Sequence, residues 1–412
     1  MYVLHAKGIY DSGSRTLDAT GMAVEGNRIL WIGMYDKIPQ PIYDKATFLD
    51  LSDFYLLPGL VNTHVHLEFD STPTARIHYI GQSQSVRLAR ALAQAQMMML
   101  SGVTTVRDAG SSWELLEITD PSLTSLYRLP RFQLSGPPIT VTGGHLNFMH
   151  VEADTPDEIR KSVREHHKRG CTSIKMMVTG GQMTPGSGPD RESYSTEEIS
   201  VLVRESHHLK LPTIAHCLTT RGFVNCMEAG IDSIEHCACF VRNQENLLLE
   251  RIYETDVMQH YQNDHRFFMN GLSASYHTFD AVRDGIKKPD EREKFLLMQE
   301  DRMFSIFSKL VDLGLLPVVG TDAGVSNTFF DETYRELELM CERGGLSEAQ
   351  AIEAGTINGA ACLGLQDSIG RLAEGFLADI IALVGNPLED IHAFREVPWI
   401  MRDGEIVKGS DI

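Results

Sequence analysis

Between about Pro58 and Leu365 the chain alternates short apolar runs with longer stretches of helical periodicity. Such alternation is typical of a mostly parallel sheet covered by helices. Eight runs predict strands: Tyr55–Val61, Thr104–Asp108, Phe132–Ser135, Ser173–Val178, Thr213–His216, Asp232–His236, Phe267–Leu272 and Leu316–Thr321. Eight strands over roughly 300 residues favour an α/β fold of the (β/α)8 TIM-barrel type over an open sheet. For the seventh strand, Val257–Tyr261 is the alternative.

Helix boundaries support this count of strands. Thr155-Pro156-Asp157-Glu158 is a capping box with proline at the first helical position. The same box recurs at Ser195–Glu198 and at Ser347–Gln350, and an Ala-, Leu- and Met-rich helix is predicted over Ser85–Ser101.

Both ends of the chain follow a different pattern. Residues 1–54 and 366–412 give short alternating strands separated by turns, of which Asp403-Gly404 is a typical hairpin turn. We therefore predict one small β-sandwich domain assembled from 1–54 and 366–412, flanking a barrel domain that spans 55–365.

Composition narrows the class of protein. The 412 residues carry 37 Lys and Arg against 56 Asp and Glu, a formal net charge of −19, which argues against nucleic acid or an anionic membrane as a partner. The seven cysteines are an odd number in a large chain, which indicates reduced thiols. With no apolar run of membrane-spanning length and no signal peptide at Met1–Ala6, we expect a cytoplasmic protein.

Candidate chemistry begins where the first predicted strand ends. His64 and His66 follow this apolar run, and strand positions two apart share a face. Both imidazoles therefore point to one place, as ligands of zinc or a neighbouring transition metal do. The alternative is a pair of surface histidines at a strand end.

Three more strands end in possible metal ligands. His216 and His236 close the fifth and sixth predicted strands, and Asp322 follows the eighth. Each alone is compatible with a core or rim residue, or with a turn cap for Asp322. Because the carboxyl ends of barrel strands meet at one face, their convergence with His64 and His66 predicts a metal site there.

Lys175 lies inside the fourth predicted strand. Barrel strands are buried on both faces, so an ammonium there is costly and its pKa is expected to fall. Either the side chain extends to the barrel rim, or the neutral amine has reacted with carbon dioxide to give an anionic carbamate that can bridge two metal ions.

In this order, these residues resemble the amidohydrolase superfamily. The matching motifs are Pro58–His66, Gly102–Gly110, Lys175, His216, His236, Gly320–Gly324, Thr356–Ala360 and Gly375–Asp379. Within the superfamily, the chain is most similar to the imidazolonepropionase-like and Xaa-Pro dipeptidase (prolidase)-like subgroup.

The resemblance implies a binuclear centre, usually of zinc. His64 and His66 would bind one ion, His216 and His236 the other, carboxylated Lys175 would bridge them, and Asp322 would complete the shell of the first ion. A hydroxide between the metals would attack the substrate, and Asp322 would serve as general base and then acid. His145 matches a family motif and would stabilise the oxyanion; alternatively it is a loop histidine bonded to backbone.

Two segments bear on the substrate. Prolidase-like members carry Ala-His-Ala-Tyr at the end of strand five, whereas this chain has Leu218 in place of the tyrosine that contacts a substrate carboxylate. With Leu272–Phe279, which includes Tyr276 and His277, this predicts an uncharged or aromatic substrate group. The loop Gly180–Pro189 lacks the Gly-Lys-Ser/Thr of a phosphate cradle and is interpreted as substrate-facing.

The leading hypothesis is a homo-oligomeric hydrolase that opens a carbon–nitrogen bond in a small molecule: an amide, N-acyl amino acid, dipeptide, urea or carbamate. The first alternative is a mononuclear deaminase or imidazolone-type cyclic amide hydrolase, in which Lys175 has no task. A non-catalytic scaffold is the second alternative, although none of the expected ligands is missing.

Overall fold

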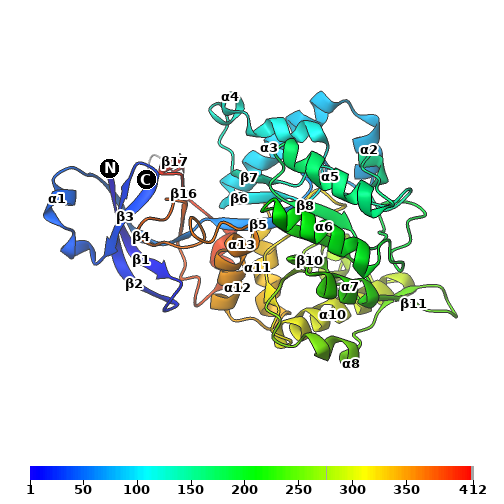
Figure 1. The fold of residues 1–412 in the computed structure, drawn as a ribbon. Helices are drawn as coiled ribbons and strands as arrows, with labels where there is room; N and C mark the ends of the chain where they lie inside the picture. The colour runs from blue at the N-terminus through cyan, green and yellow to red at the C-terminus, as the bar shows by residue number, and fades with distance from the viewer. Residues whose placement is uncertain (275, 410–412) are drawn as a thin grey trace.

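The computed structural model describes residues 1–274 and 276–409. Its centre consists of parallel strands in a three-stranded and a five-stranded sheet (Figure 1). The first sheet contains β5 (Leu60–Val65), β6 (Val103–Asp108) and β7 (Arg131–Leu134). The second contains β8 (Ile174–Met177), β9 (Thr213–Cys217), β10 (Ser233–His236), β13 (Phe267–Met269) and β14 (Leu316–Pro317).

Backbone hydrogen bonds join the two sheets at both edges. Ile139, which follows β7, accepts from the Met177 N–H and donates to Lys175 of β8, both at 2.9 Å. On the other side, Thr63 of β5 donates to Val319 and His66 donates to Ala323, both at 2.8 Å. The sheets therefore close into a barrel, as predicted.

Helices surround the strands (Figure 1). The longer ones are α3 (Gln84–Leu100), α5 (Pro156–Lys168), α6 (Thr196–His208), α7 (Thr220–Ala229), α10 (Glu291–Asp312) and α11 (Thr333–Glu342). The shorter ones are α1 (Gln40–Tyr43), α2 (Ala75–Gly81), α4 (Pro121–Thr124), α8 (Thr255–Met258), α9 (Asp280–Arg283), α12 (Glu348–Ala354) and α13 (Ile357–Cys362). The three predicted capping boxes are present at α5, α6 and α12, and Asp290 forms a further one at α10.

The two ends of the chain form one seven-stranded sheet beside the barrel (Figure 1). Its order is β17 (Glu405–Lys408), β16 (Trp399–Arg402), β15 (Ile380–Leu383), β4 (Thr47–Pro58), β1 (Tyr2–Asp11), β2 (Thr16–Glu25) and β3 (Arg28–Gly33). Ile29 donates to Phe376, and Ala378 donates to Asn27, both at 2.9 Å. Both ends of the chain thus build one sheet with a shared apolar core, as predicted, and its strands belong to a single sheet. The domain division at 54/55 and 365/366 stays a proposal.

Two details of the predicted strands differ from the structure. The run Tyr55–Val61 is not one strand, because β4 continues to Pro58 in the terminal sheet and β5 begins at Leu60. Between them Gly59 donates to Asp379, whereas Leu60 donates to Gly102, so the pairing changes sheets without a polar residue to mark it. Val257–Tyr261, the alternative seventh strand, is helical.

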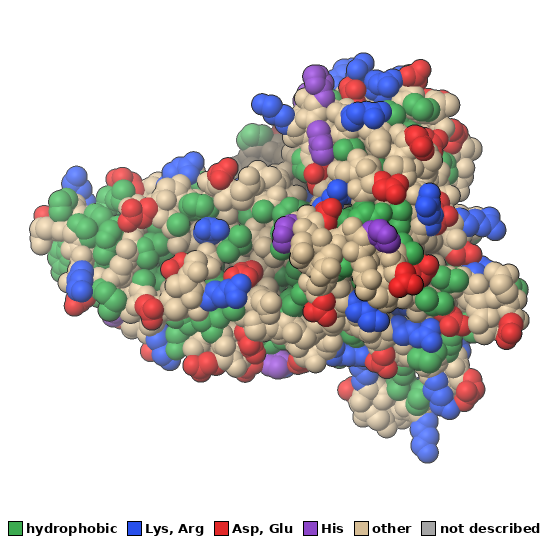
Figure 2. Space-filling view, turned by 60° about the horizontal axis from the view of Figure 1, so that its bottom comes forward, with side chains coloured by type: hydrophobic (Ala, Val, Ile, Leu, Met, Phe, Trp, Pro, Cys, Tyr) green, Lys and Arg blue, Asp and Glu red, His purple; other side chains and the backbone are tan. Residues whose placement is uncertain are grey.

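Three further properties concern surface charge, membrane-spanning helices and cysteines. On the face in Figure 2, basic and acidic side chains are interspersed. Among residues 1–274 and 276–409, no helix combines the length and the apolar character needed to span a membrane. All seven cysteines are free thiols.

Candidate metal centre

His64 and His66 lie at the end of β5 with their rings 5.3 Å apart. Both are buried, which excludes the surface-pair alternative. Each Nδ1 is already engaged, that of His66 with the Gly110 carbonyl at 2.8 Å and that of His64 with Glu235. A histidine whose Nδ1 is held in this way presents Nε2 to a metal.

Asp322 faces these two histidines from the end of the eighth strand. Its Oδ1 lies 3.5 Å from His64 Nε2 and 3.3 Å from His66 Nε2. The Asp322 N–H donates to the His64 carbonyl at 2.9 Å, which fixes the carboxylate opposite the pair. One ligand atom from each of the three residues lies within 4.8 Å of the others. His64 Nε2 is buried without a hydrogen bond in the described chain, so this donor set fits a metal ion.

The other three predicted histidines continue this cluster. The ring of His236 lies 5.3 Å from that of His64 and 4.8 Å from that of His216, and His145 lies 4.5 Å from His216. His216 Nε2 hydrogen-bonds the Gly180 carbonyl at 3.2 Å, which leaves Nδ1 for another partner. Gly181 packs on His145 so closely that an added Cβ would lie 2.4 Å from the ring.

Burial keeps these imidazoles neutral. It lowers the pKa of His145 to about 3 and that of His236 to about 4, and it holds the pKa of His216 well below the usual value. Only a neutral imidazole has a lone pair for a metal. His145, His216 and His236 are therefore in the protonation state that metal binding requires, whereas the pKa of His66, beside Asp322, is raised.

Lys175 lies on β8, is 1% exposed, and lines the same cavity as the histidines. Its Nζ is shielded from solvent and has no hydrogen-bond partner among the described residues, so the side chain does not extend to the rim. Burial lowers its pKa to about 8. A buried amine without a partner is costly unless its charge is removed or compensated, which fits a carbamate.

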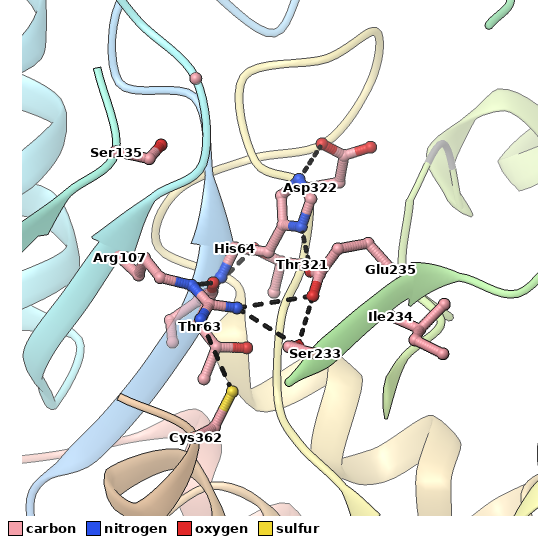
Figure 3. A network of polar contacts seen from close by, with 12 residues as sticks. Thr63, His64, Arg107, Ser135, Ser233, Ile234, Glu235, Thr321, Asp322 and Cys362 are labelled. Atoms are coloured by element: carbon pink, nitrogen blue, oxygen red, sulfur yellow. Dashed lines mark hydrogen bonds and ion pairs between the residues drawn. The ribbon is translucent and has the colours of Figure 1, made fainter. Parts of the chain in front are cut away.

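A buried polar network supports His64 from below (Figure 3). Its imidazole lies between Asp322 and Glu235, and Glu235 also accepts from Ser233 Oγ at 2.5 Å. Arg107 Nη2 lies 3.5 Å from Glu235 Oε1. The Nε of Arg107 donates to the Thr63 carbonyl at 2.7 Å. Glu235 thereby fixes the His64 ring with its Nε2 directed toward Asp322.

Replacing Glu235 by glutamine is expected to weaken zinc binding by about 10- to 100-fold, because the amide no longer fixes the His64 tautomer. Competition with a chelator measures the zinc Kd. Ser233→Ala is the matched control, since it removes a bond to the other carboxylate oxygen and leaves the His64 contact. An unchanged Kd in a Glu235→Gln protein with native thermal stability would contradict this role.

All seven predicted site residues line one cavity of about 590 Å³. Gln182 and Met183 also line it, as predicted for the loop after β8. Tyr276 and His277 are not among the lining residues; His277 instead contacts Asp280 and Glu332, and Ala274 reaches the cavity from this segment. Ser275 lies outside the described residues.

The hairpin of β11 (Phe240–Arg242) and β12 (Leu249–Arg251) was not predicted from the sequence. This hairpin follows β10 and contributes Phe240 and Arg251 to the cavity. The turn-forming run Asn243–Asn246 between two short apolar stretches was the available signal. The orienting role of Glu235 was also missed, because it depends on a contact across the barrel.

The closed barrel, with a His-x-His pair ending its first strand and an aspartate after its eighth, defines a TIM-barrel protein with a candidate metal site at the carboxyl ends of its strands. Residues 55–407 match the model of the amidohydrolase family. The chain belongs to this family and is a hydrolase of carbon–nitrogen bonds. The family and fold predicted from the motifs are confirmed.

The chain aligns with three known proteins over 90% or more of its length. Ochratoxinase from Aspergillus niger is 26% identical over 445 aligned positions, covering 100% of this chain and 87% of that protein. Imidazolonepropionase from Symbiobacterium thermophilum is 23% identical, covering 90% and 86%. The crystal structure of a Xaa-Pro dipeptidase with methionine bound in the active site is 25% identical with a TM-score of 0.84, covering 99% and 100%.

Proposed function

We propose that the protein hydrolyses an amide-type carbon–nitrogen bond of a small molecule at a binuclear metal centre, with zinc as the expected metal. The observation that carries this proposal is the buried Lys175 Nζ, which has no partner in the described chain and shares a cavity with five histidines and Asp322. A single-metal site has no use for this lysine.

In this proposal His64, His66 and Asp322 hold one ion, and His216 and His236 hold the other. Lys175, as a carbamate, would be a further ligand of the centre. When bound, the ions lower the pKa of a coordinated water and polarise the carbonyl of the substrate.

Asp322 and His145 then act directly on the substrate. The Asp322 carboxylate accepts the proton of the attacking water and returns it to the leaving nitrogen. His145 is neutral at working pH, because burial lowers its pKa to about 3, so it donates a hydrogen bond without bringing a charge. Gly181 against its ring keeps the imidazole in place for the developing oxyanion.

One observation favours a second candidate, a mononuclear cyclic amide hydrolase. The three residues whose ligand atoms already lie within 4.8 Å of one another are those of a single site. Imidazolonepropionase also aligns over most of the chain. This candidate assigns no role to Lys175.

The test is an activity screen of protein loaded with zinc, using N-acyl amino acids, dipeptides, aryl ureas, carbamates and imidazolone-type cyclic amides. We expect cleavage of an open-chain amide, urea or carbamate, lost on chelation and restored by zinc. Turnover of cyclic amides alone would support the second candidate, and no zinc-dependent turnover of any of these would contradict the proposal. A homo-oligomeric state and a cytoplasmic location stay predictions.

A further inference from the structure

Arg251 brings a positive charge into the cavity of the candidate metal centre. It ends β12 and lines the cavity together with Phe240 of the paired strand β11. Its backbone N–H donates to the buried Gln299 side chain at 2.7 Å, which ties the end of the hairpin to α10. The backbone of Arg251 is therefore anchored at the cavity wall.

No carboxylate within residues 1–274 and 276–409 forms an ion pair with Arg251. The guanidinium carbon lies 4.6 Å from the Phe240 ring centroid. Nη1 reaches the Ala238 carbonyl at 3.4 Å, Nη2 lies 3.9 Å from Met303 Sδ, and Nε is buried with no hydrogen-bond partner. Burial lowers the pKa of Arg251 to about 10, so the site disfavours the charge that it holds.

A second arginine of the same hairpin, Arg242, is neutralised by a carboxylate. Arg242 forms a two-pronged ion pair with Asp190, at 2.7 and 2.6 Å. The chain has 56 acidic against 37 basic side chains, so acidic partners are abundant. Arg76, which also lines the cavity, likewise has a buried Nε without a hydrogen-bond partner and no ion pair among the described residues. The planar donors of such a guanidinium suit a carboxylate, and Arg251 is the one beside the apolar hairpin wall.

The wall near Arg251 is otherwise apolar. Leu218, Ala238 and Phe240 form one buried cluster, and Leu218 stands where prolidase-like chains carry a tyrosine for the substrate carboxylate. The sequence alone predicted an uncharged or aromatic substrate group from Leu218. Because Arg251 lies on the same wall, an anionic group of a substrate could be bound there even though residue 218 is not a tyrosine.

We propose that Arg251 binds the carboxylate of the substrate, and that the substrate is an N-acyl amino acid or dipeptide with an apolar side chain. This rests on the proposed function, because it places the carboxylate beside the bond that the metal centre would cleave. The carboxylate would accept hydrogen bonds from the Arg251 guanidinium, and the substrate side chain would pack on the cluster of Leu218, Ala238 and Phe240.

The experiment measures equilibrium binding and turnover of two probes, N-acetyl-L-phenylalanine and its carboxamide, which differ only in the charge of one group. We expect the wild type to bind the acid more tightly. Arg251→Met is expected to weaken binding of the acid by about 100-fold and that of the carboxamide by less than about 3-fold, while Arg251→Lys is intermediate. Arg242→Met is the control for a disturbed hairpin, and we expect it to preserve the preference for the acid.

Equal affinity of the wild type for both probes, including binding of neither, would overturn the role of Arg251. An equal loss of affinity for both probes in Arg251→Met would also overturn it. Loss of the preference for the acid in Arg242→Met would do the same. Failure of the proposed function is distinguishable, because selective binding that depends on Arg251 would then persist in zinc-loaded protein that cleaves neither this amide bond nor any other amide.

Discussion

Replacing Lys175 by alanine is expected to lower kcat by about 1,000-fold or more and to reduce the metal bound per chain from two ions toward one. In the proposed binuclear centre this substitution removes a ligand shared by both ions. A group needed in the transition state is then lost, which costs at least as much as an oxyanion donor. Lys175 also has no hydrogen-bond partner in the described chain that its removal would leave unpaired. Metal analysis and steady-state kinetics measure the two effects.

A rescue experiment separates the carbamate from a packing role for Lys175. Acetate or propionate should partly restore activity to Lys175→Ala, because a small carboxylate can enter the space and supply the bridging oxygens. Lys175→Met is the matched variant, since its side chain fills this space and should prevent rescue. Wild-type metal content and activity in Lys175→Ala would favour the mononuclear candidate.

Replacing Asp322 by asparagine is expected to lower kcat by about 10,000-fold, on the scale of disabling one member of a catalytic group. The amide cannot accept the proton of the attacking water. The substitution keeps the size of the side chain and suits the backbone, which lies in the left-handed region at φ 59°, where asparagine is tolerated. Steady-state kinetics measures the loss.

Circular dichroism and thermal unfolding are the controls for Asp322→Asn, and both should match the wild type. Asp322→Ala should be no more active but less stable, because alanine disfavours a positive φ. A decrease of less than about 10-fold in kcat for Asp322→Asn would show that another group carries the proton.

The barrel was predictable because its strands are buried apolar runs that end beside chemically distinctive residues. His64, His66, His216, His236 and Asp322 could be grouped from sequence, since the carboxyl ends of parallel strands meet at one face. The start of the first strand was not predictable. Leu56, Leu57 and Leu60 are equally buried, although they belong to different sheets.

Side-chain contacts between residues far apart in the sequence could not be predicted either. Glu235 meets His64 across 171 positions, and no local pattern encodes this contact. His277 pairs with Glu332 outside the cavity, so an aromatic and imidazole-rich segment does not by itself mark a binding wall. Arg251 enters the cavity only because a short hairpin brings it there.

Diffraction from crystals of zinc-loaded protein, with anomalous data at the zinc edge, would show directly whether the centre is binuclear and whether Lys175 is carboxylated. We expect two ions bridged by a carbamate on Lys175, with His64 and His66 on one ion and His216 and His236 on the other. A single ion, with Lys175 unmodified and directed away from it, would contradict the proposed binuclear centre.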